Sequence, residues 1–240
     1  MKDLLVVVPS RGRPGNIAGL LDAMEATCEG DTTLVVGLDD DDPTWEDYPL
    51  GPIYEVRGGL RQVVAWINEL ALPEVDNYRW IGHFGDDNLP RTPGWDLRIM
   101  EALERTPFAF GNDLYPRAPG SLSCHVFTRS DVIKTLGYFG PPRIRHMYVD
   151  VAWMAWGIRT GIAYLDDVVI EHMHFTVGKS AHDEVYAASQ ALIGAADLAA
   201  WHSYSRDPDG LNADIVKLGG EPFMADELRA FNAGLFIPEI

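Results

Sequence analysis

An alternation of buried-strand patterns with helix patterns along the first half of the chain is the feature that most constrains its fold. Residues 4–8 form a continuous apolar run, which is typical of a strand buried on both faces. Further strand patterns cover residues 33–38, 53–56 and 78–84, and helix patterns cover residues 16–26, 60–70 and 93–104. Because helical crossovers bring successive strands side by side, this alternation predicts an α/β fold with a mainly parallel central sheet flanked by helices.

The second half of the chain is less regular. Strand patterns cover residues 108–110, 122–128 and 162–175, and helix patterns cover residues 129–136 and 149–159. From about residue 180 the sequence is alanine-rich and helical to about residue 202, and one or two more helices are expected after the turn at 206–210. We therefore expect a main domain over residues 1–178 and a helical C-terminal extension, residues 179–240, packed on the same domain.

The composition is that of a globular protein. Hydrophobic residues make up 47% of the 240 residues, which is enough for a real core. The net charge of −17 is spread along the chain and disfavours binding along a DNA backbone, which needs clustered Lys and Arg. Cys28 and Cys124 have no CxxC spacing, and neither a signal-peptide pattern nor an apolar run of about 18 residues is found. We expect a cytoplasmic protein without a membrane partner.

Carboxylates directly follow two of the predicted strands. Asp39–Asp42 comes after the strand at 33–38, and Asp86 and Asp87 come after the strand at 78–84. Ligands of open α/β sheets bind beyond the carboxyl ends of the strands, and carboxylates gathered there need a cation, a sugar hydroxyl or a base edge as partner. In Asp39–Asp42 we expect one or two side chains to face a nucleoside and the others to face water. The alternative is a solvated acidic turn. Asp86 and Asp87 favour a hard divalent cation such as Mg²⁺.

A loop with two arginines follows the first strand. It runs Pro9-Ser10-Arg11-Gly12-Arg13, and guanidinium groups in such a loop could hold a diphosphate through paired hydrogen bonds. The chain lacks the GxGxxG and GxxxxGK[ST] patterns there, so a dinucleotide site or a P-loop is not supported. The alternative is a polar loop with surface arginines.

Three further side chains are candidates for chemistry. His172 and His174 lie two apart on the predicted strand at 162–175, so their side chains should share one face, and nitrogen ligands beside carboxylates suit Mn²⁺ as well as Mg²⁺. Two buried, hydrogen-bonded histidines are the alternative. Asp150 begins a predicted hydrophobic helix, where it is either an N-terminal cap or a general base for an acceptor hydroxyl.

Taken together, these segments resemble a glycosyltransferase of the GT-A fold, most closely family 2, over residues 4–178. The opening Leu5-Val-Val-Val-Pro9-Ser10-Arg11 is similar to the first strand and loop of that family. Val36-Gly-Leu-Asp39-Asp40 resembles its nucleoside-contacting strand end, and Ile81-Gly-His-Phe-Gly-Asp86-Asp87 resembles its metal-binding DxD strand. The same segments are also similar to small glycosyltransferases encoded by bacteriophages.

The resemblance implies a metal-dependent enzyme with a Rossmann-like GT-A sheet. Such an enzyme transfers sugar from a nucleotide-diphosphate sugar to an acceptor hydroxyl. The QxxRW pattern of processive synthases is absent, which favours transfer of a single sugar, and a base that deprotonates the acceptor implies inversion. Carried onto this chain, it implies Asp87, His172 and His174 as ligands of Mn²⁺ or Mg²⁺ and Asp150 as catalytic base. The donor would contact Pro9, Ser10, Arg11, Arg13, Asp39, Asp41, Arg61 and Asp86.

Two other functions stay open at this stage. A nucleotidyltransferase with a similar sheet is the first, although Ser10–Pro14 only half fits its glycine-rich loop. A non-catalytic GT-A-like binding module is the second. The sequence also leaves open the nucleotide, the sugar, the acceptor (a protein, a glycan or a modified nucleobase) and whether the chain forms a homo-oligomer.

Overall fold

The structure is a computed structural model that describes residues 1–49, 54–59, 62–183, 185–187 and 194–235. Strands in order are β1 (Lys2–Ser10), β2 (Thr32–Asp39), β3 (Tyr54–Gly58), β4 (Tyr78–His83), β5 (Asn88–Pro90), β6 (Phe108–Asn112), β7 (Val126–Arg129) and β8 (Ile162–His172). Helices are α1 (Pro14–Thr27), α2 (Val63–Ala71), α3 (Trp95–Leu103), α4 (Ser130–Leu136), α5 (Val149–Thr160), α7 (Gly194–Arg206), α8 (Leu211–Lys217) and α9 (Ala225–Gly234).

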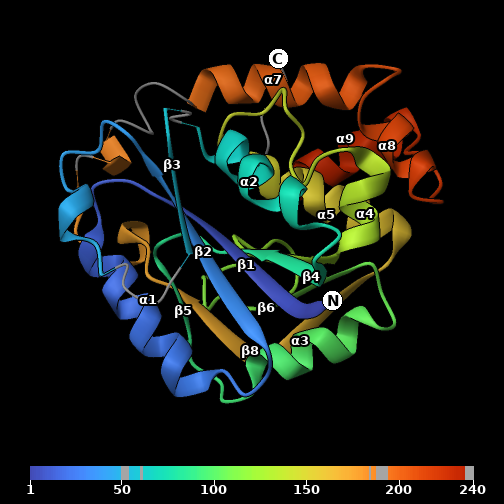
Figure 1. Cartoon of the computed structure of the whole chain (residues 1–240). Helices are drawn as coiled ribbons and strands as arrows, with labels where there is room; N and C mark the ends of the chain where they lie inside the picture. Colours follow the sequence, from blue (N-terminus) through green and yellow to red (C-terminus); the bar gives the residue numbers. More distant parts are fainter. Residues whose placement is uncertain (50–53, 60–61, 184, 188–193, 236–240) are drawn as a thin grey trace.

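The strands form one central sheet with helices on both faces (Figure 1). The strand order is β3-β2-β1-β4-β7-β6-β8-β5. The first four strands in this order are mutually parallel, as are β6 and β8, whereas β7 and β5 run antiparallel to their neighbours. The predicted α/β fold with a mainly parallel sheet is confirmed.

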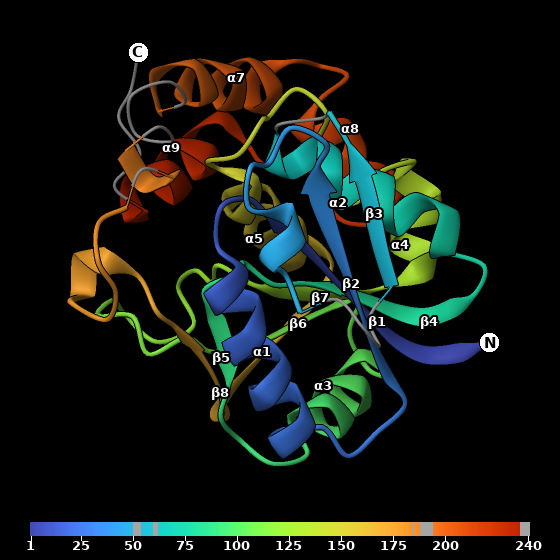
Figure 2. The ribbon, with the colours of Figure 1, turned by 60° about the vertical axis from the view of Figure 1, so that its left-hand side comes forward.

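Alternating side chains of β1 build two separate cores. Leu5 and Val7 belong to the core beneath α2 and α5, whereas Leu4, Val6 and Val8 belong to the core beneath α1 and α3. All five side chains are at most 2% exposed. Because successive side chains of a strand point to opposite faces, a strand covered by helices on both sides must be apolar throughout. The two views agree that α1 and α3 cover one face and the remaining helices the other (Figures 1 and 2).

The C-terminal helices pack on the α2–α5 side of the sheet. Trp201, Tyr204 and Leu211 are buried in the same core as Trp156 of α5. The Trp156 indole N–H donates to Tyr204 Oη at 3.0 Å, so α7 is tied to α5 by a buried hydrogen bond as well as by apolar contact. Among the described residues, none of the helices has the length and apolar character needed to cross a bilayer.

Several sequence-based boundaries differ from the structure. The strand predicted at 162–175 ends at His172, where it pairs with Asn88, and the chain then forms a 3₁₀ turn at Phe175–Val177. His174 therefore lies just beyond the strand, where it caps that turn and accepts a hydrogen bond from the Thr176 N–H. The two imidazole rings nevertheless lie 5.0 Å apart, as expected for side chains two positions apart in extended backbone. The short strand β5 was not predicted. Part of the strand predicted at 53–56 and part of the helix predicted at 180–202 lie outside the described residues.

Candidate active site

The acidic loops after β2 and β4 lie close together because the strands that carry them are neighbours of β1. Ser10, at the end of β1, pairs with Leu38 of β2, and Val7 pairs with His83 of β4. All three strands point the same way, so their carboxyl ends meet at one edge of the sheet. The structure thus brings Ser10, Asp39 and Asp86 to one edge of the sheet, where a ligand of an open α/β sheet is expected.

Asp39 is buried at the tip of β2 and is held from two sides. The Trp66 indole N–H donates to its Oδ1 at 3.0 Å, and Arg11 Nη1 donates to its Oδ2 at 3.2 Å. Arg11 also donates to Asp41 Oδ1 at 2.6 Å, and both of these side chains are about 40% exposed. The Arg11 guanidinium therefore reaches from the first loop across the tip of β2 and remains accessible to a ligand.

Asp42 fastens the loop after β2 to the loop after β1. Its Oδ2 accepts the Gly12 N–H at 2.8 Å, and its Oδ1 accepts the Thr44 N–H and hydroxyl at 2.9 and 2.8 Å. Burial alone would raise the pKa of Asp42, but these hydrogen bonds from Gly12 and Thr44, with one from Tyr48, outweigh it and lower the pKa. Asp42 is 1% exposed. The sequence predicted that each of these aspartates faces either a nucleoside or water, whereas Asp42 faces the protein itself.

Asp86 and Asp87 are adjacent in sequence but have opposite environments. Asp86 accepts hydrogen bonds from Ser10 Oγ at 2.8 Å and from Arg13 Nη1 at 3.0 Å, yet its burial raises its pKa to about 6. For Asp87, burial is outweighed by hydrogen bonds from His172 and Tyr186, which hold the pKa at about 2. Of this pair, Asp87 is therefore the one with the firmly ionised carboxylate.

Asp87 is the point where distant parts of the chain converge. Its Oδ2 lies 3.2 Å from His172 Nε2 at the end of β8, and the Tyr186 hydroxyl donates to the same oxygen at 2.7 Å. The Met173 N–H donates to the Asp87 carbonyl at 2.8 Å, which fixes the end of β8 against this loop. The His174 ring lies 5.0 Å from the His172 ring, and its Nδ1 is 2.7 Å from Thr176 Oγ1.

Arg13 joins the site to the segment after β8. Its Nε and Nη2 donate to the two carboxylate oxygens of Asp183, each at 2.8 Å, and its guanidinium stacks on the Tyr186 ring at 4.0 Å. Asp183 and Tyr186 were not predicted as site residues, because their segment shows only helical character in the sequence. No pattern in the sequence indicates that this segment folds back over Asp87.

Two more donor atoms lie beyond His172. Asp113 follows β6 and Cys124 precedes β7, and Asp113 Oδ2 is 3.9 Å from Cys124 Sγ. These two atoms and a ring nitrogen of His172 all lie within 4.8 Å of one another. Sequence analysis did not single out either residue: Cys124 lacks a metal-ligand spacing, and Asp113 is a lone carboxylate, although its place after a strand was an available signal.

Asp150 lies in the first turn of α5, after Tyr148 in a left-handed conformation with φ of 71°. Its Oδ1 accepts the Val151 N–H at 2.9 Å. Burial raises its pKa, while the hydrogen bond from Val151 and the positive charges of Arg117 and His172 act in the opposite direction. The carboxylate is thus within electrostatic reach of His172.

Arg61, expected to contact a donor, lies outside the described residues.

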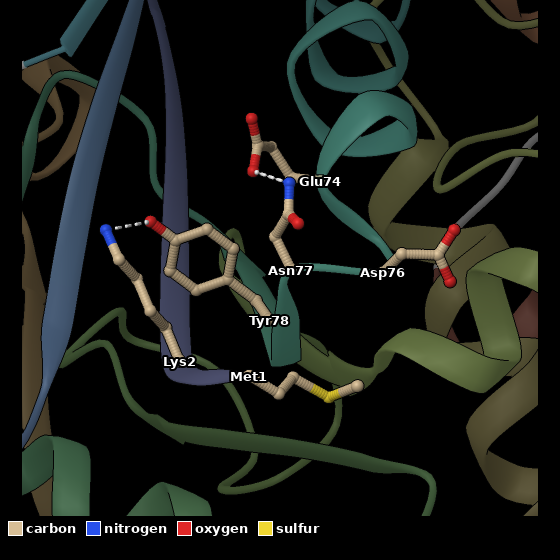
Figure 3. Close-up of a pocket in the computed structure, with 6 residues that line it drawn as sticks. All are labelled: Met1, Lys2, Glu74, Asp76, Asn77 and Tyr78. Atoms are coloured by element: carbon tan, nitrogen blue, oxygen red, sulfur yellow. Dashed lines mark hydrogen bonds between the residues drawn. The ribbon is translucent and has the colours of Figure 1, made fainter.

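A cavity of about 250 Å³ adjoins this region. It is lined by residues of the segment 111–122, among them Asp113, Tyr115 and Arg117, and by Tyr164 of β8. A second cavity, of about 320 Å³, lies at the amino ends of β1 and β4, between Lys2, Tyr78 and neighbouring polar side chains (Figure 3). It includes none of the candidate site residues, so the first cavity is the one that bears on the site.

The sequence matches no known protein-family model and none of the curated proteins compared with it. Solved structures do resemble it. A mannosyltransferase from Pyrobaculum calidifontis, in complex with GDP-Man and Mn²⁺, superimposes with a TM-score of 0.55 at 13% identity, over 100% of this chain and 83% of that one. Glucosyl-3-phosphoglycerate synthase from Mycobacterium tuberculosis, in complex with Mn²⁺, UDP-Glc and phosphoglyceric acid, gives a TM-score of 0.54 at 15% identity. The match covers 83% of this chain and 79% of that one.

TarS from S. aureus gives a TM-score of 0.54 at 13% identity, over 71% of this chain and 36% of that chain, so the present chain spans only about a third of it. At such identities the likeness concerns the fold. The chain has the GT-A fold of these glycosyltransferases, as the sequence resemblance implied.

Proposed function

We propose that this protein is a metal-dependent glycosyltransferase that transfers a single sugar from a nucleotide-diphosphate sugar to an acceptor hydroxyl, with inversion. The observation that carries the proposal is the meeting of Asp87 and His172, 3.2 Å apart, at the carboxyl end of β4. It lies beside two arginines in a GT-A fold whose solved neighbours include enzymes crystallised with Mn²⁺ and nucleotide sugars.

The pair fits a divalent ion. An octahedral ion with ligands at about 2.1 Å places neighbouring ligands about 3 Å apart, which matches the separation of Asp87 Oδ2 and His172 Nε2. Asp87 is ionised and mostly buried, and a carboxylate with an imidazole suits Mn²⁺. When bound, Mn²⁺ or Mg²⁺ would neutralise the charge on the leaving diphosphate. His174 Nδ1 is held by Thr176, so His174 would join the set through Nε2.

The remaining donor contacts follow from the two loops. Asp39, fixed by Trp66, presents its carboxylate to a nucleoside, and Arg11 and Arg13 supply guanidinium groups for the diphosphate. Ser10 and Asp86 hold Arg13 in place, since Asp86 accepts from both side chains. Pro9 lies within β1, paired with Gly37 of β2, and so precedes the loop in which it was predicted. Asp41 belongs to the loop after β2, where it accepts a hydrogen bond from Arg11.

Asp150 is the proposed base. A general base works best when its pKa approaches the working pH, and burial raises the pKa of Asp150 from its ordinary value. The cavity beside Asp113 and Arg117 is the proposed acceptor site, because Arg117 is within electrostatic reach of Asp150. In this arrangement Asp150 takes the proton from an acceptor hydroxyl as that oxygen attacks the sugar.

The proposal is tested by screening nucleotide diphosphates and their sugars for thermal stabilisation of the chain with Mn²⁺ and then with a chelator. Mass action predicts about 2.7 kcal/mol of added stability at a ligand concentration 100 times the dissociation constant. Any stabilising sugar nucleotide is then assayed for release of its nucleoside diphosphate. Release of pyrophosphate from a nucleoside triphosphate would instead favour a nucleotidyltransferase. Binding without turnover in the presence of varied acceptors would favour a binding module.

A further inference from the structure

We propose that Asp113, Cys124 and His172 form a second metal site, which shares His172 with the proposed Mn²⁺ site and is suited to a thiophilic divalent ion such as Zn²⁺. A carboxylate oxygen of Asp113, Cys124 Sγ and a ring nitrogen of His172 lie within 4.8 Å of one another. A tetrahedral Zn²⁺ ion, with Zn–N near 2.0 Å and Zn–S near 2.3 Å, separates its ligands by about 3.3–3.8 Å. The 3.9 Å between Asp113 Oδ2 and Cys124 Sγ is close to this.

The orientation of His172 is the strongest support. Its Nε2 faces Asp87 Oδ2 at 3.2 Å, so this nitrogen can donate its hydrogen to a carboxylate. Its other nitrogen, Nδ1, is buried and has no hydrogen-bond partner among the described residues. Metal-bound histidines regularly donate their second ring N–H to a carboxylate, which fixes the ring and leaves the other nitrogen for the metal. Asp87 and His172 have this relation, with Nδ1 available for an ion.

The other two ligands are oriented in the same way. Asp113 accepts the Tyr115 N–H on Oδ1 at 3.0 Å and an Arg117 hydrogen bond on Oδ2. Asn88 Nδ2 donates to Cys124 Sγ at 3.2 Å, a contact that would stabilise a thiolate. Each ligand thus has an outer partner, as ligands of protein metal sites usually do.

The donor set decides the kind of ion. A thiolate, an imidazole and one carboxylate suit Zn²⁺, whereas Mg²⁺ and Mn²⁺ prefer oxygen-rich sites. Binding releases the thiol proton of Cys124, and three protein ligands leave a fourth position for water. Asp113 also lines the cavity of about 250 Å³, which gives an ion a route from solvent. With Nδ1 on an ion, Nε2 carries the hydrogen that Asp87 accepts, so an ion at this site and a bond from Nε2 to Mn²⁺ exclude each other. Ion binding here is measured without any glycosyl transfer.

The test is to titrate the chelator-treated full chain with Co²⁺, whose thiolate charge-transfer absorption reports a Co–S bond. We expect one Co²⁺ per chain with this absorption, displaced by Zn²⁺. Cys124→Ser should lose the absorption and weaken Zn²⁺ binding by more than the 10–100-fold typical for loss of an outer partner. Cys28→Ser is the matched control, because Cys28 is the other cysteine and lies at the end of α1 with Met24 as its contact. Cys28→Ser should leave the charge-transfer absorption and the Zn²⁺ affinity unchanged.

A second measurement uses the unmodified chain and does not depend on whether Cys124→Ser folds. The rate of alkylation of each cysteine is followed by mass spectrometry with and without Zn²⁺. We expect Zn²⁺ to slow the alkylation of Cys124 at least tenfold and to leave that of Cys28 unchanged. Equal rates at Cys124 with and without Zn²⁺, or charge-transfer absorption that survives in Cys124→Ser, would overturn the proposal.

Discussion

The acidic loops after β2 and after β4 have similar sequences but serve the molecule differently. In the loop after β2, Asp42 accepts hydrogen bonds from Gly12, Thr44 and Tyr48, all of which belong to this loop and the loop after β1. In the loop after β4, Asp87 meets His172 and Tyr186, which come from the end of β8 and from the segment beyond it. The loop after β2 is held by contacts with itself and with the loop after β1, whereas the loop after β4 contacts segments that are distant in the sequence.

The difference lies in the partners rather than in the carboxylates. A backbone N–H cannot leave its carboxylate without moving the chain, so Asp42 is committed to structure. An imidazole and a phenol on separate segments can yield to a metal ion or a substrate, so Asp87 is available for chemistry. A binding site needs side-chain partners that a ligand can displace. We therefore expect Asp→Asn to reduce activity in the loop after β4 and to reduce stability in the loop after β2.

The largest effect is expected for Asp87→Asn, which removes the charge of the proposed metal ligand. Loss of one group that stabilises developing charge costs on the order of 10²–10³ in turnover. We expect the rate of nucleoside diphosphate release to fall by that factor and Mn²⁺ to lose its stabilising effect in thermal unfolding. Circular dichroism without metal should match the unmodified chain. Normal turnover by a folded Asp87→Asn variant would remove Asp87 from the mechanism.

Asp42→Asn should damage stability. The amide group of Asn would set an N–H against the Gly12 N–H or the Thr44 N–H, and a buried donor without a partner costs about 1–3 kcal/mol. The free energy of unfolding in urea should fall by that amount at pH 7. Because the pKa of Asp42 is lowered in the fold, its contribution is complete above the unfolded value of about 3.9 and is lost as the pH falls below it. The variant should therefore lose part of the acid dependence of stability.

These two outcomes also mark how far the sequence alone could lead. The strand patterns placed Asp39 and Asp87 at the carboxyl ends of two strands, which in the structure flank β1, because buried parallel strands are continuous apolar runs. They could not separate Asp42 from Asp41, since the burial of Asp42 depends on its contacts with Tyr48 and with Gly12, which lies 30 positions earlier.

The sequence was least informative where contacts are long-range. Strand β5 has three residues, including a proline, and exists because Asn88 and Leu89 pair with the end of β8. Tyr186 gives no signal of its contact with Asp87, 99 positions away. Cys124 was set aside for lack of a spacing pattern, yet the fold places it beside His172. The order of the strands brings these residues together, and no periodic pattern in the sequence indicates such contacts.

Tyr186→Phe sharpens the view that the partners of Asp87 are exchangeable. The ring would remain stacked on Arg13, while the hydroxyl that donates to Asp87 Oδ2 would be lost. A typical hydrogen bond contributes about 1 kcal/mol, which corresponds to roughly fivefold in an equilibrium constant. Since the hydroxyl competes with a metal ion for this oxygen, we expect Mn²⁺ to bind about fivefold more tightly in a calorimetric titration. Weaker binding would mean that Tyr186 supports the ion instead of displacing it.

Asp41→Asn should have the smallest effect on stability and completes the series of three identical substitutions. Asp41 is next to Asp42, but its side chain is 39% exposed and its partner Arg11 is 40% exposed. Exposed ion pairs contribute about 0–1 kcal/mol and are screened by salt, so the free energy of unfolding should change by less than about 0.5 kcal/mol, and by less still in high salt. A loss as large as that of Asp42→Asn would mean that the whole loop is a structural unit. A small loss would show that Asp42 alone fastens the loop after β2 to the loop after β1.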